Sequence, residues 1–498
     1  MAAPSFESTY AELPERFHAR IAPTPVAAPR LLRLNEALAE SLGLDPEWLR
    51  SAEGVALLAG NNVPDSVRPV AMAYAGHQFG NFTPQLGDGR AILLGERRDR
   101  AGRLFDVQLK GAGPTPFSRS GDGRAAIGPV LREYVVSEAM AALGIPTTRA
   151  LAAVATGEPV QRETPLPGAI LARVARSHLR VGTFEFFASR GDVEALRTLA
   201  GYAIERLHPE AANAENPALA LFESVVRAHA ELVPQWLGVG FVHGVMNTDN
   251  TTISGETIDY GPCAFLDAYH PGQTFSSIDH AGRYAYGRQP GIAAWNLARF
   301  AETLLPLLGE TQEEQIAAAQ AVLDGFEPRF QERWREVLRR KLGLVRMDES
   351  GLALATDLLD AMAEQRADFT LTWRALAASL EEGPSGAPAR APNEIGAAAG
   401  FEDPAAFEAW GTRWRARIRE EGRGADEVRE ALLGANPARI PRNHRIEEAI
   451  VAARQDDLGP FDRLVAGLAH PFADDPRFDD LMTAPRPEEV VRQTFCGT

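Results

Sequence analysis

The 498-residue sequence has only two cysteines, Cys263 and Cys496, and no long uninterrupted apolar segment. Two cysteines cannot supply a structural zinc site, and they do not make a disulfide framework. A membrane-spanning helix needs about 20 consecutive apolar residues, so we expect no contact with a membrane. The first 20 residues are polar and include three glutamates, which is unlike a secretory signal or a transit peptide. These absences predict a cytoplasmic protein.

Basic residues are fewer than acidic ones, with 51 Lys and Arg against 67 Asp and Glu, and the formal net charge is −16. Nucleic-acid binding depends on clustered positive charge, so this balance predicts no nucleic-acid partner. This net charge is compatible with a nucleotide ligand, because binding a nucleotide needs only a few local cations. The hydrophobic share of 45% is that of an ordinary globular protein.

The pattern of apolar residues changes along the chain. Residues 1–70 are expected to form a helical extension, because residues 31–42 carry apolar side chains at helical spacing and Gly43 follows as a C-cap. Residues 71–180 contain short strand-like segments, such as 91–95 and 104–110, and a helix from Pro129 to Leu143 that ends before Gly144.

The rest of the chain is mainly helical. Residues 181–345 are helical except for a loop-and-hairpin segment at 241–265, and residues 346–498 form a C-terminal helical region with a Pro/Gly/Ala-rich linker at 383–393. A strand-rich part followed by a helical part predicts an α+β protein with two lobes rather than an alternating α/β sheet.

The most informative segment is residues 243–261, His-Gly-Val-Met-Asn-Thr-Asp-Asn followed by Thr-Thr-Ile-Ser-Gly-Glu-Thr-Ile-Asp-Tyr-Gly. Two strand-like runs separated by Gly255 and Glu256 predict a β-hairpin. The hairpin would bring Asn250 and Asp259 together at its open end. An amide oxygen beside a carboxylate suits a phosphate-bound Mg²⁺ or Mn²⁺, so both residues are candidate metal ligands.

The same order of residues occurs in protein kinases, where a His-x-Asp loop precedes a metal-binding Asn and an Asp-Phe-Gly. Here Val245 stands where the kinase catalytic Asp belongs. The nearest replacement is Asp249, immediately before the candidate metal ligand Asn250. Capping of a turn is the alternative role for this Asp-Asn pair.

A kinase-like site also requires a strand lysine held by a helix glutamate. Lys110 ends the strand-like run 104–110, and the helix after Pro129 offers Glu133 and Glu138. These two glutamates point to different faces of a helix, and Glu133 shares its face with apolar residues. Glu133 is therefore predicted to pair with Lys110, with exposure to solvent as the alternative.

Two glycine-rich loops and one basic cluster complete the candidate nucleotide site. Backbone amides freed by glycine approach phosphates closely, and arginines add charge-assisted hydrogen bonds. Taken alone, these loops could be ordinary turns and the cluster a solvated helix end. The candidates are Gly87, Gly89 and Arg90 in the first loop, Asp122 and Gly123 in the second, and Arg173, Arg176 and Arg180 in the cluster.

With these segments in place, the sequence resembles the selenoprotein O family over most of its length. The strings that carry the resemblance are residues 23–25, 74–80, 85–90, 108–113, 118–119, 243–250, 259–262, 436–437, 440–443 and 494–498. The resemblance implies a bilobal, protein-kinase-like fold and transfer of AMP, or UMP, from ATP or UTP to Ser, Thr or Tyr hydroxyls of proteins. It also implies Mg²⁺ or Mn²⁺ as cofactor and a nucleotide bound in the reverse of its kinase orientation.

The resemblance also implies roles for individual residues. Lys110 and Glu133 match the lysine–glutamate pair, Asp249 the proton acceptor, and Asn250 and Asp259 the metal ligands. Asp259 also matches a nucleotide contact, as do Gly87, Gly89, Arg90, Lys110, Asp122, Gly123, Arg173 and Arg180. The residues alone predict an ATP- and metal-binding kinase fold with an altered base, and the step to nucleotidyl transfer comes from the resemblance.

Two other functions stay open at this point. One is a kinase that uses Asp249 as its base on a protein or a small molecule, and the other is a binding scaffold without activity. The sequence does not identify the protein substrates or the oligomeric state, for which a monomer is expected. Cys496 lies where some members of the family carry selenocysteine, and we expect that it forms a redox-sensitive bond with Cys263, although two independent thiols are the alternative.

Overall fold

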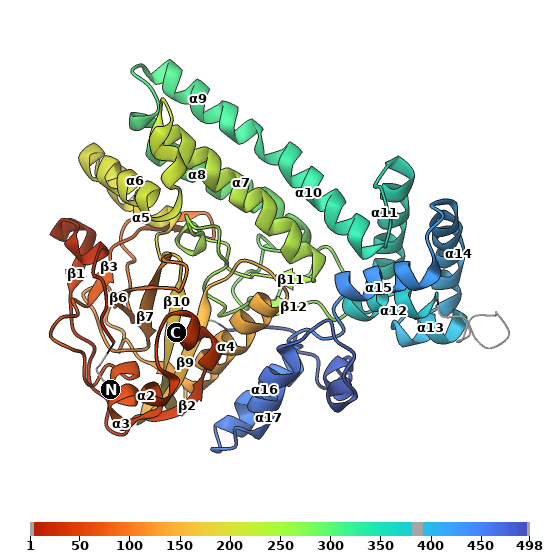
Figure 1. Ribbon diagram of the computed structural model, residues 1–498, viewed down its shortest axis with the longest axis horizontal. Coiled ribbons are helices and arrows are strands. Elements are labelled where there is room, and N and C mark those ends of the chain that lie inside the picture. The colour runs from red at the N-terminus through yellow and green to blue at the C-terminus, as the bar shows by residue number, and fades with distance from the viewer. Residues whose placement is uncertain (1–3, 381–391, 496–498) are drawn as a thin grey trace.

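The computed structural model describes residues 4–380 and 392–495. Figure 1 shows a strand-rich part built from the first third of the chain and an extended array of helices built from the rest. The protein is thus a mixed helix-and-sheet protein in which strands and helices are largely separate along the chain. This arrangement agrees with the predicted α+β class. In the described residues, no helix combines the length and apolarity needed to cross a membrane.

One antiparallel sheet forms the centre of the strand-rich part. Among the described residues it has eight strands in the order β1, β3, β6, β7, β10, β9 and β2, with β8 paired to β10. Their bounds are β1 His18–Arg20, β2 Arg30–Leu34, β3 Val70–Met72, β6 Ala91–Arg98, β7 Leu104–Lys110, β8 Ala125–Ala126, β9 Arg149–Gln161 and β10 Pro165–Ala175. A separate two-stranded pair joins β4 Gly76–Gln78 to β5 Asn81–Thr83.

The central strand β7 separates its polar and apolar side chains by simple alternation. Val107 and Leu109 are buried in an apolar cluster on one face. Asp106, Gln108 and Lys110 alternate with them and point to the other face. The strand register therefore places three polar side chains on the face that carries the site.

The helix α4 (Ile127–Ala142) packs against β9 and β10. It confirms the helix predicted from Pro129, with a start two residues earlier, and it ends just before Gly144, whose φ is +78°. Most of α4 is buried, including Glu133 at 4% exposure. A buried carboxylate needs a charged or hydrogen-bonding partner, and the site described below provides it.

Residues 1–70 do not form the purely helical extension expected from the sequence. The segment supplies both edge strands of the sheet, β1 and β2, as well as α1 Glu36–Ser41, α2 Pro46–Arg50 and α3 Ala52–Leu58. The apolar run 31–42 changes structure at Asn35, whose side chain accepts a hydrogen bond from the Leu38 amide at 3.1 Å and caps α1. The apolar spacing before Asn35 fits both a helix and a strand. Pairing of β2 with β9 makes this segment a strand.

The helical part begins after β10. Its helices are α5 Val181–Ala188, α6 Val193–Leu207, α7 Pro217–Gly238, α8 Gln289–Leu304, α9 Gln312–Asp324, α10 Phe326–Lys341, α11 Glu349–Glu364, α12 Phe369–Ala378, α13 Pro392–Ala398, α14 Pro404–Glu420, α15 Ala425–Ala435, α16 Asn443–Ala453 and α17 Gly459–Leu468. Two short strands, β11 Phe241–Val242 and β12 Ala264–Phe265, pair within the loop between α7 and α8 and bracket its residues 243–263. In Figure 1, α16 and α17 return from the helical array to lie beside α4. Most of the predicted linker 383–393 lies outside the described residues.

Lys341, at the end of α10, is buried among aromatic rings. Its Nζ lies 4.8 Å from the ring centre of Trp373 and 5.7 Å from that of Phe369. Burial lowers the pKa of Lys341 from its ordinary value to about 7. The unfolded chain therefore holds this proton more tightly than the folded protein between pH 7 and roughly pH 10.4.

We expect Lys341→Met to stabilise the protein at pH 7, because it removes a buried charge. Stability of the parent protein rises with pH through this window, so the advantage of the variant should shrink by about 2 kcal/mol between pH 7 and pH 9. Urea unfolding of both proteins at the two pH values measures the change. Other titrating groups cancel in the comparison, and an advantage that is constant with pH would contradict the assignment.

Candidate active site

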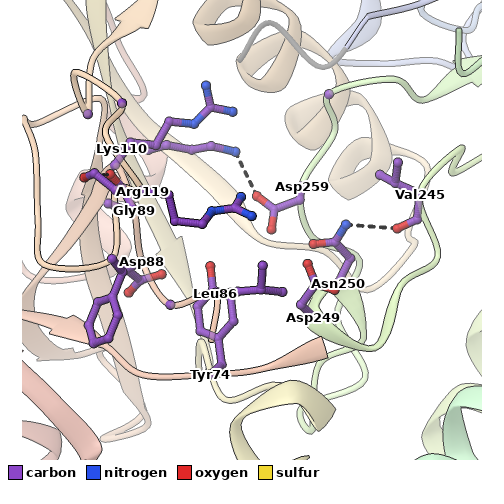
Figure 2. A pocket seen from close by; sticks show the side chains of 18 of the residues that line it. Tyr74, Leu86, Asp88, Gly89, Lys110, Arg119, Val245, Asp249, Asn250 and Asp259 are labelled. Atoms are coloured by element: carbon purple, nitrogen blue, oxygen red, sulfur yellow. Dashed lines mark hydrogen bonds and ion pairs between the residues drawn. The ribbon is translucent and has the colours of Figure 1, made fainter. Parts of the chain in front are cut away.

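A pocket of about 710 Å³ lies where the sheet meets the loop between α7 and α8 (Figure 2). Two of the predicted candidates do not line it: Glu133, which lies behind Lys110, and Arg176. The predicted residues that line it are Gly87, Gly89, Arg90, Lys110, Asp122, Gly123, Arg173, Arg180, Asp249, Asn250 and Asp259. The fold therefore brings together residues that are up to 172 positions apart in the sequence.

Lys110 joins the sheet to α4 and to the loop. Its Nζ donates to Glu133 Oε2 at 2.6 Å and to Asp259 Oδ1 at 2.8 Å. Glu138, the other candidate on α4, accepts hydrogen bonds from Arg149 at 2.7 and 2.9 Å, away from Lys110. The two glutamates thus face opposite ways, as their spacing on a helix requires.

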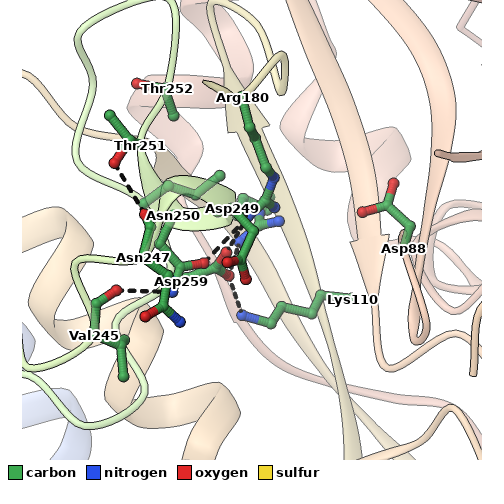
Figure 3. A network of polar contacts seen from close by, with 12 residues as sticks. Asp88, Lys110, Arg180, Val245, Asn247, Asp249, Asn250, Thr251, Thr252 and Asp259 are labelled. Atoms are coloured by element: carbon green, nitrogen blue, oxygen red, sulfur yellow. Dashed lines mark hydrogen bonds and ion pairs between the residues drawn. The ribbon is translucent and has the colours of Figure 1, made fainter. Parts of the chain in front are cut away.

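Asp259 is surrounded by three cations. Besides Lys110, Arg173 Nη1 donates to its Oδ1 at 2.7 Å. Arg180 Nη1 donates to its Oδ2 at 2.6 Å, and Figure 3 shows Lys110 and Arg180 beside Asp259. Arg173 also donates to Glu133 Oε1 at 3.0 Å. Burial works to raise the pKa of the Asp259 carboxyl, but the three cations outweigh it and hold that pKa well below its ordinary value.

The pKa of the Glu133 carboxyl is lowered in the same way, because Lys110 and Arg173 outweigh the effect of burial. This cluster holds three cations, Lys110, Arg173 and Arg180, against two carboxylates, Glu133 and Asp259. The surplus of positive charge faces the pocket. An anionic ligand such as a polyphosphate would balance it.

The β-hairpin predicted within residues 251–260 does not form. Thr252 instead pairs with Arg180 and Thr257 with Thr147, so each arm of the loop bonds to a different neighbouring segment. The buried Glu256 side chain adds to this arrangement by accepting from the Arg176 amide at 2.9 Å. These contacts across the fold replace the local pairing that the turn residues predicted.

Asn250 and Asp259 still converge without the hairpin. Asn250 Oδ1 lies 3.4 Å from Arg180 Nη1, which also contacts Asp259 Oδ2. Asn250 Nδ2 donates to the Val245 carbonyl at 2.9 Å, and this bond turns Oδ1 toward Asp259 (Figure 2). One amide oxygen and one carboxylate facing the same point make a donor set that fits a hard divalent cation completed by phosphate oxygens and water.

His243 supports this loop through a hydrogen bond. Its Nε2 is 2.9 Å from the Ile258 carbonyl, one residue before Asp259. Burial lowers the pKa of His243 to about 4, so the ring is neutral near pH 7 and Nε2 donates its hydrogen to the carbonyl. Asp259 itself has a φ of +64°, an uncommon backbone conformation for a residue other than glycine. His243 therefore supports the geometry of the loop and lies outside the residues that line the pocket.

Asp249 is the predicted proton acceptor, and it lines the pocket beside Asn250 (Figure 2). Burial raises the pKa of its carboxyl to about 6, against the lowering effect of a hydrogen bond from Gln78. Gln78 Nε2 donates to Asp249 Oδ2 at 3.1 Å. Val245, an apolar residue, lines the same pocket.

The first glycine loop is shaped by close packing. Gly87 has a φ of +72°, and a Cβ at this position would overlap the Phe117 ring. Asp122 in the second loop lies at the rim, where Arg162 pairs with it at 2.8 Å. The predicted basic cluster divides: Arg173 and Arg180 reach the pocket, whereas the Arg176 guanidinium donates to the Leu207 carbonyl outside it.

Sequence reasoning about the site missed several residues that line the pocket. They are Tyr74, Gln78, Phe79, Asp88, Phe117 and Arg119 among others. Burial raises the pKa of Asp88 to about 6, and Arg180 lies 4.9 Å from the ring centre of Tyr74. The unusual string at residues 74–80 was the available signal for Tyr74, Gln78 and Phe79. Its partners lie in a distant part of the chain.

The predicted bond between Cys263 and Cys496 stays a prediction, because Cys496 lies outside the described residues. Cys263 is buried, and its Sγ donates to the Tyr260 carbonyl at 3.3 Å. Thr494 is bonded to the Pro262 carbonyl through its Oγ1 at 2.5 Å. The described end of the chain therefore lies beside the segment that contains Cys263.

Comparison with known proteins identifies relatives over nearly the whole chain. A family model described as protein adenylyltransferase SelO matches residues 1–469. The chain is 59% identical over 495 residues to a protein nucleotidyltransferase YdiU of Methylorubrum populi, covering 99% of both proteins. It is 57% identical over 493 residues to a protein of the same name from Nitrobacter hamburgensis, covering 99% of this chain and 96% of the relative. The chain therefore belongs to the SelO family of protein adenylyltransferases.

Proposed function

We propose that this protein transfers AMP, or UMP, from a nucleoside triphosphate to Ser, Thr or Tyr hydroxyls of other proteins. The observation that carries the proposal is the convergence of Lys110, Arg173 and Arg180 on Asp259, all of which line the pocket. This cluster has an excess of positive charge that suits a triphosphate, and Asn250 offers a second oxygen beside it. Membership of the adenylyltransferase family supports the choice of reaction.

A two-lobed, kinase-like architecture is part of this proposal. Residues 71–180 form the first lobe, with the sheet, α4 and the Lys110–Glu133 pair. Residues 181–345 form the second lobe, with the loop that carries Asp249, Asn250 and Asp259. Residues 1–70 and 346–498 flank the two lobes. The pocket lined by both lobes supports this division, because kinases bind their nucleotide between lobes.

Asn250 and Asp259 would hold Mg²⁺ or Mn²⁺ together with the phosphates. A bound divalent cation neutralises phosphate charge and polarises a phosphoryl oxygen. Lys110, Arg173 and Arg180 then contact phosphate oxygens, while Glu133 keeps Lys110 and Arg173 in place. Gly87, Gly89, Arg90, Asp122 and Gly123 complete the proposed nucleotide site along the pocket wall.

Asp249 accepts the proton of the attacking hydroxyl in this proposal. The hydroxyl oxygen forms a bond to the α-phosphorus, the bond from that phosphorus to the bridging oxygen breaks, and pyrophosphate leaves. The apolar Val245 supports transfer of the α-phosphoryl group with the nucleotide reversed. A hydroxyl that approached as it does in a kinase would meet Val245 where it needs a base.

Label transfer distinguishes this reaction from that of a kinase. The protein is incubated with Mg²⁺ or Mn²⁺ and ATP labelled with ³²P at either the α- or the γ-phosphorus, and with α-labelled UTP. We expect protein-bound label from the α-position and none from the γ-position, with an added AMP mass on modified peptides. Asp249→Asn should remove the label.

Label from γ-labelled ATP would instead identify a kinase that uses Asp249 as its base. Absence of any metal-dependent ATP turnover would identify a binding scaffold. Either result would overturn the proposed function.

A further inference from the structure

The segment 74–80 packs against the loop that carries Asp249, residue by residue. The His77 amide donates to Thr248 Oγ1 at 2.7 Å, and the Phe79 amide donates to Asn247 Oδ1 at 3.1 Å. Between them, Gln78 Nε2 donates to Asp249 Oδ2 at 3.1 Å. Three consecutive residues of one segment therefore contact three consecutive residues of the other.

Further bonds keep the two segments in this register. The Glu185 carboxylate accepts from Thr248 Oγ1 at 2.5 Å and lies 2.6 Å from His77 Nδ1, so one buried side chain contacts both segments. Tyr284 OH donates to Asn247 Oδ1 at 2.6 Å. Segment 74–80 is thus a rigid wall of the pocket rather than a loose loop.

The two oxygens of Asp249 have different surroundings. Oδ2 accepts the hydrogen bond from Gln78, whereas Oδ1 is buried and accepts no hydrogen bond from the residues that the structure describes. Oδ1 lies against Gly76, where a Cβ would overlap it. Oδ1 is therefore enclosed against the backbone of Gly76, and the hydrogen bond from Gln78 to Oδ2 fixes the direction of the carboxylate.

We propose that Gln78 is a positioning residue, which holds Oδ2 of Asp249 and so fixes the orientation in which this carboxylate meets the acceptor hydroxyl. Gly76 contributes by leaving room for Oδ1. This inference rests on the proposed role of Asp249 as proton acceptor. Within the described residues, Gln78 makes no hydrogen bond to Lys110, Arg173 or Arg180, so its loss should affect the transfer step rather than nucleotide binding.

The test compares an isosteric variant with a truncated one. Gln78→Glu keeps the size of the side chain but replaces the amide donor with an acceptor, and Gln78→Ala removes both. We expect each to lower kcat by about 10²-fold and to leave KM for ATP within about twofold, as loss of a positioned general base predicts. Thermal melting checks that both variants fold. Gln85→Ala, an exposed glutamine of the neighbouring loop, is the control with normal activity.

A role in packing alone predicts a different pattern. Gln78→Glu would then be nearly as active as the parent protein while Gln78→Ala is impaired, and this result would overturn the proposal. Gly76→Ala tests the other side of the carboxylate and should also lower kcat. Gly201→Ala, at a glycine with open space around it, is its control.

Asp249→Asn separates failure of this inference from failure of the proposed function. If Asp249→Asn keeps full activity, the proposed acceptor is wrong and the role of Gln78 falls with it. If Asp249→Asn is inactive while Gln78→Glu is unimpaired, only the inference fails. We expect Asp249→Asn to be inactive and the double variant to lose nothing more, because the two residues act as one unit.

Discussion

Replacing Asp259 with alanine should lower nucleotidyl transfer by about 10³-fold or more, because a metal on phosphate oxygens contributes several kcal/mol to transition-state stabilisation. Asp259 is the carboxylate on which Lys110, Arg173 and Arg180 converge. Its removal takes away the one charged ligand of the proposed metal. Label transfer from α-labelled ATP, measured over a range of Mn²⁺ concentrations, gives the loss.

The fold should survive this change, because each cation keeps another partner. Lys110 and Arg173 remain bonded to Glu133, and Arg180 still donates to the Asp249 carbonyl at 2.5 Å. Melting temperature and circular dichroism test this point. Asp65→Ala, which changes an exposed acid, is the control with unchanged activity. A folded Asp259→Ala protein with normal activity would refute the metal site.

Loss of Lys110 and loss of Glu133 should have effects that are far from additive. The two side chains are bonded at 2.6 Å, and Glu133 acts on the pocket by holding Lys110 and Arg173. We expect Lys110→Ala and Glu133→Gln each to lower kcat/KM for ATP by about 10²-fold. The double variant should have a kcat/KM only slightly below that of the less active single variant. A double-mutant cycle on kcat/KM measures the coupling.

Glu138 is the matched control on the same helix. Its carboxylate accepts from Arg149 and from the Ala150 amide at 2.9 Å, away from the pocket. Glu138→Gln should therefore lower the melting temperature with little change in kcat/KM for ATP. Impaired transfer by Glu138→Gln, together with normal transfer by Glu133→Gln, would show that Glu138 and not Glu133 supports the nucleotide site.

Local sequence patterns were sufficient for much of the fold and for most of the pocket. The alternation in residues 104–110 predicted the strand that ends at Lys110, and Pro129 with Gly144 predicted α4. Helical rotation alone separated Glu133 from Glu138. These predictions hold because strand period, helix period and glycine caps are properties of short segments, which fold much the same way in many surroundings.

Other features depended on which segments meet in three dimensions. The turn at Gly255 and Glu256 predicted a hairpin, but its two arms do not pair with each other. One arm pairs with Arg180 and the other with Thr147. The apolar run that starts at residue 31 was equally compatible with helix and strand until β9 paired with it. Backbone groups must find partners, and when neighbouring segments offer them, tertiary pairing outweighs local preference.

The sequence by itself determined which residue types would line the site, and tertiary structure decided what each of them contacts. Nothing local connects Gln78 with Asp249, which are 171 positions apart, or gathers Arg173 and Arg180 around Asp259. Polar groups buried by packing must be paired to offset their loss of water, and the available partners are set by the whole fold. That is why many residues that line the pocket could be predicted from motifs, while their network of charges and hydrogen bonds could not.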